Sequence, residues 1–224
     1  MSYTAIETEN QLLQLKKAGL TGGRLIACVG DSITFGYTVP RSACWCTLAG
    51  QMTGNRLINL GQCGDTTGGM AARAAGLAEV SGLDAVAVMG GGNDLMMGVP
   101  ASVIRENLLG IARKAAENGA APIVCLFSPV TPAGVPQFFT YPPYFADSDE
   151  FDAARRALDE SLREAAAKEG WLCVDFTPAL TRPDGTADPA LYNDNVHPNA
   201  AGHRRMAEVF AAALRELFPG EETK

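Results

Sequence analysis

The sequence predicts an α/β protein in which five parallel strands form a sheet that helices cover on both faces. Three observations carry this prediction. Short, almost uninterrupted apolar runs of strand length recur along the chain. Segments with helical spacing of apolar residues separate these runs, and the alternation is typical of a buried parallel sheet. Polar, glycine-marked loops follow the first three runs, as expected at the ligand-binding edge of an open α/β sheet.

The expected elements follow in chain order from these patterns. The apolar runs expected as strands are residues 24–29, 57–60, 84–89, 122–127 and 171–174. The helices are expected at 6–18, 42–53, 70–80 and 100–118, in a segment that starts at Asp147, and in a last segment that includes 206–217. The stretches expected as loops are 30–41, 61–69, 90–94, 128–147 and 176–198. No internal repeat, low-complexity tract or linker interrupts the pattern, so residues 1–224 are predicted to form a single domain.

Composition and charge narrow the classes of partner. The chain has 224 residues, of which 47% are hydrophobic, and a domain of this size buries a full core. The formal net charge of -7 argues against nucleic acid and anionic membrane surfaces as partners. No stretch approaches the apolar length of a membrane span. Residues 1–17 lack a basic start followed by an apolar run, so we expect no signal peptide and a cytoplasmic location.

The cysteines and histidines are expected to bind no metal. Of the six cysteines, Cys28, Cys125 and Cys173 lie in apolar strand-like runs, where free cysteine behaves as a small hydrophobic residue. His197 and His203 are the two histidines, and neither forms a Cys/His cluster with zinc spacing. The sequence therefore predicts free thiols in a reducing compartment and no structural metal.

Three residues that lie far apart in the sequence can form a nucleophilic site. Ser32 stands at the carboxyl tip of the first strand, and the loop that ends at His197 emerges at the same edge after the fifth strand. Ser32 would attack a carbonyl carbon, and His197 would accept the serine proton and later protonate the leaving group. Asp194 precedes His197 by three residues and could bond the far ring nitrogen.

Acyl transfer also needs donors that converge on the developing oxyanion. The backbone N–H groups of Ser32 and Gly64 and the side-chain amide of Asn93 can supply three donors at this edge. Glycine at position 64 permits close backbone approach and unusual backbone angles.

Four sequence blocks give the chain its resemblance to a known family. They are Gly-Asp-Ser-Ile-Thr (30–34), the glycine in Cys-Gly-Asp-Thr-Thr (63–67), Gly-Gly-Asn-Asp (91–94) and Asp-Asn-Val-His-Pro-Asn (194–199). In this order and at these spacings the chain resembles the GDSL/SGNH hydrolase superfamily, with isoleucine at 33 where the family name has leucine. The resemblance implies a three-layer α/β/α sandwich with a flavodoxin-like five-stranded sheet in the order 2-1-3-4-5. It also implies ester or thioester hydrolysis without a metal or organic cofactor.

The substrate stays open at this stage. Lysophospholipids, thioesters and short acyl esters compete with acetylated carbohydrates, and a catalytically silent binding protein on the same scaffold is the alternative from another class. The long segment 128–147 carries an aromatic cluster that is either a substrate lining or a plug on the core: Phe138, Phe139, Tyr141, Tyr144 and Phe145. The aromatic cluster favours an apolar acyl group, and the expected lack of a secretion signal argues against extracellular polysaccharide.

Three other polar residues near these blocks are assigned supporting roles. His203 lies at the start of the apolar stripe of the last helix and is expected to pack in the interior or behind the site. Asp31 and Asp94 each adjoin a proposed site residue in a turn, so we expect them to accept hydrogen bonds from loop backbone N–H groups.

Overall fold

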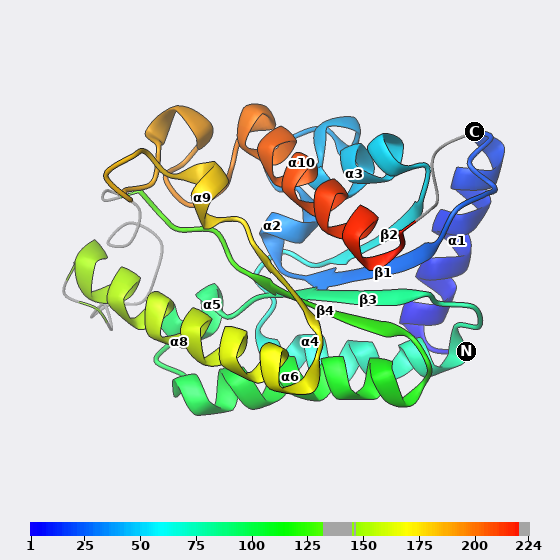
Figure 1. The fold of residues 1–224 in the computed structure, drawn as a ribbon, viewed down its shortest axis with the longest axis horizontal. Helices are drawn as coiled ribbons and strands as arrows, with labels where there is room; N and C mark the ends of the chain where they lie inside the picture. The colour runs from blue at the N-terminus through cyan, green and yellow to red at the C-terminus, as the bar shows by residue number, and fades with distance from the viewer. Residues whose placement is uncertain (132–144, 146, 220–224) are drawn as a thin grey trace.

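The computed structural model describes residues 1–131, 145 and 147–219. A five-stranded parallel sheet with the order β2-β1-β3-β4-β5 forms its centre (Figure 1). The strands are β1 (Leu25–Gly30), β2 (Arg56–Gly61), β3 (Ala85–Met89), β4 (Ala121–Leu126) and β5 (Leu172–Asp175). The expected strands and their order are confirmed, with each boundary within one residue of its predicted place.

Helices form a layer on each face of the sheet (Figure 1), so the three-layer α/β/α architecture is confirmed. One layer contains α2 (Ser32–Phe35), α3 (Trp45–Thr53), α9 (Thr177–Leu180) and α10 (Ala200–Leu217). The other contains α4 (Thr67–Ala74), α5 (Gly92–Met96), α6 (Ala101–Glu117) and α8 (Ser148–Glu169). Short 3₁₀ turns join these elements at η1 (Arg41–Ala43), η2 (Ala75–Glu79) and η3 (Pro189–Leu191).

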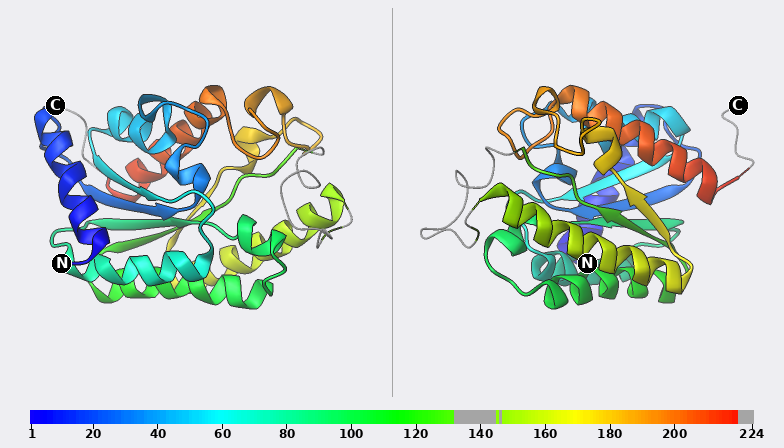
Figure 2. Two further views of the ribbon diagram at one scale, coloured as in Figure 1. Left: turned by 180° about the vertical axis from the view of Figure 1, so that it is seen from behind. Right: turned by 60° about the vertical axis from the view of Figure 1, so that its left-hand side comes forward.

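The first helix, α1 (Tyr3–Lys17), lies beside the outer edge of β2 (Figure 2). The Gln11 carboxamide bonds both backbone groups of Asn59 in that edge strand. Its Nε2 donates to the Asn59 carbonyl at 2.8 Å, and its Oε1 accepts from the Asn59 N–H at 2.9 Å. A side chain of α1 thus occupies the backbone groups that an edge strand otherwise presents to another strand.

The strand register brings the functional loops to one level. Gly30 at the end of β1 pairs with Gly61 of β2 and with Met89 of β3, and Met89 pairs with Cys125 of β4. All residues of β1 and β3 are buried, as expected of strands covered on both faces. The loops after β1, β2 and β3 therefore leave the sheet side by side.

Three short helices, α2, α5 and α9, begin in segments expected as loops, and α2 and α5 carry proposed site residues. Ser32 begins α2, where Asp31 is the N-cap and Gly36 ends the turn in the left-handed conformation. The segment after β3 forms α5, whose N-cap is Gly91 with φ of 113°. Each is about one turn long, too short to show a helical apolar period, and burial of its residues against the sheet supplies the stability that the local sequence lacks.

Candidate active site

Ser32 sits where β1 passes into α2. The Asp31 carboxylate accepts a hydrogen bond from the Ile33 N–H at 2.9 Å and so caps the first turn. The turn lies close against β2, because a Cβ on Gly61 would meet the Phe35 nitrogen at 2.1 Å. These contacts hold the Ser32 side chain at the carboxyl edge of the sheet with 9% of the residue exposed.

The structure brings Ser32, His197 and Asp194 into hydrogen-bond contact. Ser32 Oγ lies 2.9 Å from His197 Nε2, and His197 Nδ1 lies 2.7 Å from Asp194 Oδ2. Because a carboxylate can only accept, the ring hydrogen belongs on Nδ1, which leaves Nε2 as the acceptor for the serine hydroxyl. The order of groups is that of a nucleophile, a base and a residue that orients the base.

Asp194 also orders the loop that carries the histidine. Its Oδ1 accepts hydrogen bonds from the Val196 and His197 N–H groups at 3.3 and 2.8 Å. Burial acts to raise the pKa of Asp194, but the bonds from the His197 backbone and ring outweigh it, and the net pKa lies below the usual value. Asp194 therefore stays ionised while it faces the imidazole.

Tyr37 is a further residue at this site that the sequence reasoning missed. Its ring centroid lies 4.8 Å from that of His197 in an edge arrangement, and 47% of the residue is exposed. The Asn193 amide donates to Thr38 Oγ1 at 2.7 Å and so ties the two loops together. The position just after the glycine that ends α2 was the available signal, but the ring contact with His197 depends on the tertiary structure.

The loop after β2 presents the Gly64 backbone. Asp65 N donates to the Gln62 carbonyl at 3.2 Å and closes a turn, in which Gly64 has a φ of 75°. A Cβ on Gly64 would meet nothing within 4 Å, so the backbone conformation, rather than space, requires glycine. Within the part of the chain that the structure describes, the N–H groups of Ser32 and Gly64 have no hydrogen-bond acceptor.

Asn93 lies on α5 and faces the same loop. Its Nδ2 donates to the Asp65 carbonyl at 2.8 Å. A carboxamide nitrogen carries two hydrogens, so this bond orients the group and leaves one hydrogen for another acceptor. The next residue, Asp94, accepts from the Thr67 N–H at 2.9 Å and from Thr67 Oγ1 at 2.7 Å. The expected backbone-bonding roles of Asp31 and Asp94 are confirmed.

His203 bonds the backbone of α3, whereas His197 is the histidine that contacts Ser32. It is fully buried on α10, and its Nδ1 accepts from the Trp45 N–H at 3.3 Å. Burial, with a smaller contribution from the nearby His197, lowers the pKa of His203 to about 4, so the ring is neutral around pH 7. The prediction that His203 packs in the interior is confirmed.

The aromatic residues proposed to line the substrate site fall outside the described residues: Phe138, Phe139, Tyr141 and Tyr144. Phe145 is described, is buried, and packs against Phe151 of α8 with ring centroids 5.4 Å apart. This residue of the cluster is therefore part of the core.

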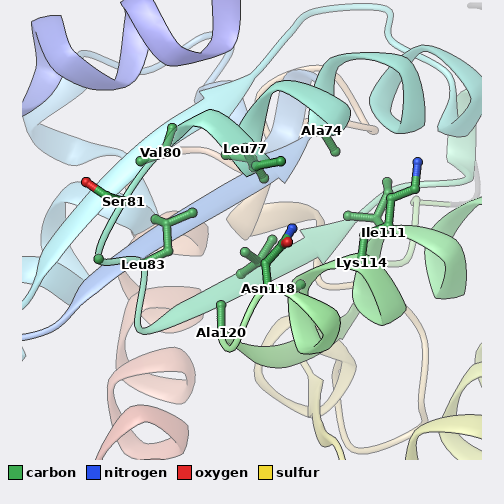
Figure 3. Close-up of a pocket in the computed structure, with 13 residues that line it drawn as sticks. Ala74, Leu77, Val80, Ser81, Leu83, Ile111, Lys114, Asn118 and Ala120 are labelled. Carbon is green, nitrogen blue, oxygen red and sulfur yellow. The ribbon is translucent and has the colours of Figure 1, made fainter.

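The surface has a cavity far from Ser32 and a groove that adjoins the Gly64 loop. A cavity of about 240 Å³ lies near the amino end of β3, between η2 and α6 (Figure 3), and Val80, Leu83 and Asn118 are among its lining residues. A groove of about 650 Å³ follows the end of β2, where Phe35 and Cys63 line it. The cavity opens at the end of the sheet opposite Ser32, whereas the groove adjoins the loop that carries Gly64.

All six cysteines are free thiols, and Cys63 is exposed. Within residues 1–131, 145 and 147–219, no group of three or more His, Cys, Asp or Glu side chains could hold a metal ion. None of the described helices has the length and apolar character needed to cross a membrane.

Comparisons with known proteins identify the family and the fold. The model of the GDSL-like Lipase/Acylhydrolase family matches residues 28–205. A lipolytic protein of the G-D-S-L family from Veillonella parvula DSM 2008 is 25% identical with a TM-score of 0.70, over 88% of this chain and 100% of that chain. An aryl esterase from M. smegmatis is 18% identical with a TM-score of 0.71, over 88% and 100% of the two chains. A carbohydrate acetylesterase family member from Sinorhizobium meliloti is 18% identical with a TM-score of 0.68, over 87% and 99%.

No curated protein sequence matches the chain. The family model nevertheless spans every element from β1 into α10, and thus each of the four sequence blocks. The chain belongs to the GDSL-like lipase/acylhydrolase family, and it is a hydrolase that acts on ester bonds.

Proposed function

We propose that this protein is a serine esterase that cleaves carboxylic esters or thioesters through Ser32, His197 and Asp194. The observation that carries the proposal is the chain of two contacts from Ser32 Oγ to His197 Nε2 at 2.9 Å and from His197 Nδ1 to Asp194 Oδ2 at 2.7 Å. His197 can therefore accept the proton of the Ser32 hydroxyl, and the negative charge of Asp194 lies at the opposite nitrogen of the imidazole ring.

The reaction follows from these positions. Ser32 Oγ attacks the carbonyl carbon while its proton passes to His197 Nε2, and the carbonyl oxygen becomes an oxyanion. The N–H groups of Ser32 and Gly64 and the amide of Asn93 donate to that oxyanion. The intermediate collapses, and the leaving alcohol or thiol takes the proton from His197. Water then attacks the acyl-serine with His197 as the base, which releases the acid and restores Ser32.

For the substrate we propose short acyl esters, thioesters or lysophospholipids, with carbohydrate O-deacetylation as the alternative. The exposed Tyr37 ring beside His197 favours an apolar acyl or aromatic group near the scissile bond. The likeness to a carbohydrate acetylesterase family member supports the alternative. A rate panel of p-nitrophenyl esters of increasing chain length, acetylated sugars and acyl thioesters distinguishes them by relative kcat/KM.

The nucleophile is tested with a fluorophosphonate probe and the Ser32→Ala variant. We expect the probe to label wild-type protein at Ser32, and ester hydrolysis to fall about 10³-fold or more in the variant at unchanged Tm. Ser42→Ala, which alters an exposed serine of η1, is the matched control and should keep full activity. Wild-type turnover in Ser32→Ala would reject the serine-esterase mechanism. A wild-type protein that the probe does not label and that hydrolyses no ester of the panel would favour a catalytically silent binding protein on this fold.

A further inference from the structure

The guanidinium of Arg73 on α4 joins three segments behind the proposed oxyanion hole. Its Nη1 donates to the Leu60 carbonyl at 2.9 Å, and its Nη2 donates to the Gly30 carbonyl at 3.3 Å. Its Nε donates to Asp65 Oδ2 at 3.0 Å, and Nη2 bonds the same oxygen. Planar guanidinium groups suit such multiple, charge-assisted bonds, which a lysine ammonium does not reproduce.

Two of these acceptors, Gly30 and Asp65, lie within two residues of one that presents a proposed oxyanion donor. Gly30 is the last residue of β1, two positions before Ser32. Asp65 directly follows Gly64, and its backbone carbonyl accepts the Asn93 amide at 2.8 Å. Arg73 therefore contacts, directly or through Asp65, the backbone segments that orient all three donors.

The positive charge of Arg73 also offsets negative charge, because three aspartate side chains lie near one another at this edge of the sheet. Asp31 and Asp94 are buried, and the Asp65 side chain is 10% exposed. Among the described residues, Arg73 is the cation that forms an ion pair with one of these three acids. Burial, together with the nearby charges of Asp65 and Asp94, raises the pKa of Asp31 to about 7, so negative charge on Asp65 or Asp94 disfavours charge on Asp31.

We propose that Arg73 and Asp65 are positioning residues for the oxyanion hole. This inference rests on the proposed function, because the donors are those of the esterase mechanism. Arg73 fixes the ends of β1 and β2 and the Gly64 turn, and it neutralises the Asp65 carboxylate beside the point where the substrate oxygen becomes negative. Neither side chain touches the substrate, so both act through Ser32, Gly64 and Asn93.

The experiment compares kcat, KM and Tm for Arg73→Gln, Asp65→Asn and the double variant on one p-nitrophenyl ester. We expect Arg73→Gln to lower kcat about 10- to 100-fold with KM within about two-fold, which is less than the loss of a whole oxyanion donor. In that variant the Asp65 charge is unbalanced. The double variant removes this charge, so its kcat should recover at least about five-fold over Arg73→Gln. Asp65→Asn alone should reduce kcat less than Arg73→Gln.

Arg24→Gln is the matched control. Arg24 also pairs with an aspartate, Asp84, at 2.9 Å, and that pair lies at the amino ends of the strands. We expect its loss to lower Tm and to leave kcat per folded molecule unchanged.

Three results would overturn the inference. Arg73→Gln could keep wild-type kcat, or its activity could fall only in proportion to the folded fraction measured by circular dichroism. The double variant could also stay as slow as Arg73→Gln. Should Arg73→Gln not fold, Asp65→Asn decides, and unchanged kcat there overturns the inference. Fluorophosphonate labelling of wild-type Ser32 separates the two proposals. Labelling together with an unaffected Arg73→Gln rejects the positioning role alone, whereas unlabelled, inactive wild-type protein rejects the proposed function itself.

Discussion

The side-chain amide of Asn93 is held in place before any substrate arrives. Its bond to the Asp65 carbonyl at 2.8 Å fixes the plane of the carboxamide and directs the remaining N–H hydrogen away from that carbonyl. A donor oriented in advance does not have to reorganise when the oxyanion forms, which is the physical basis of oxyanion stabilisation.

Replacing Asn93 tests this donor. We expect Asn93→Ala to lower kcat about 10²- to 10³-fold with little change in KM, because the bond to the oxyanion forms only in the transition state. Asn93→Asp should be slower still, since it places a carboxylate where negative charge develops. Asn107→Ala is the control, because the Asn107 amide bonds Thr67 Oγ1 of the same region at 3.0 Å and donates to no oxyanion in the proposed mechanism. Equal kcat losses in Asn93→Ala and Asn107→Ala would contradict a direct role for Asn93.

Variants of the two histidines should differ in activity, because only His197 contacts Ser32. Loss of the His197 imidazole removes the acceptor for the Ser32 proton, so His197→Ala should lose nearly as much activity as Ser32→Ala. His203→Gln should keep most of kcat and lose Tm, because His203 is buried against Trp45. Initial rates and thermal melts of the two variants measure these effects. An active His197→Ala beside an inactive His203→Gln would reverse the assignment.

Among the elements, α1 is attached to the edge strand β2 by one side chain. The Gln11 carboxamide makes the hydrogen bonds that a neighbouring strand would otherwise make. Gln11 bonds both backbone groups of Asn59, and the Asn59 side chain in turn donates to the Thr34 carbonyl of α2 at 2.6 Å. Asn59 Oδ1 also accepts from the Gly61 N–H at 3.0 Å. The edge strand is thus bonded to α1 on its outer side and to the helix of the nucleophile through Asn59.

Loss of the Gln11 amide should weaken this edge. Gln11→Ala removes both side-chain partners of the Asn59 N–H and C=O groups, so we expect a loss of about 1–3 kcal/mol in the free energy of unfolding, measured by urea titration. Gln14→Ala, at an exposed position of the same helix, should cost less than about 0.5 kcal/mol. Equal effects in the two variants would show that helix propensity, and not the edge contact, dominates.

At the scale of the whole molecule, buried acids make stability depend on pH. Burial raises the pKa of Asp31 from 3.8 to about 7, so between these values the folded protein binds one proton more than the unfolded chain at this group. Stability from Asp31 therefore falls as pH rises through this window, and the full cost is present above it. The change in pKa corresponds to roughly 4 kcal/mol.

An uncharged isostere should remove this cost. We expect Asp31→Asn, which keeps an acceptor for the Ile33 N–H, to gain stability over wild type by a few kcal/mol as pH rises from about 4 to 8. Asp149→Asn, at an exposed position of α8, should follow the wild-type curve closely. Urea unfolding at several pH values tests this, and parallel curves for Asp31→Asn and wild type would count against a buried Asp31 with a raised pKa.

The strands, with their boundaries to within one residue, could be predicted from the sequence alone, as could the residues proposed for the site. Apolar runs report burial directly, and polar loops after parallel strands must share one edge, so Ser32, Gly64, Asn93 and His197 could be grouped without coordinates. Sequence reasoning could not predict the short helices α2, α5 and α9, the Tyr37 contact with His197, or the bonds of Arg73 to Gly30, Leu60 and Asp65. The physical reason is the sequence separation over which each effect acts. Periodicity and turn preferences act over a few neighbouring residues, whereas these contacts depend on how strands and helices distant in sequence pack against each other.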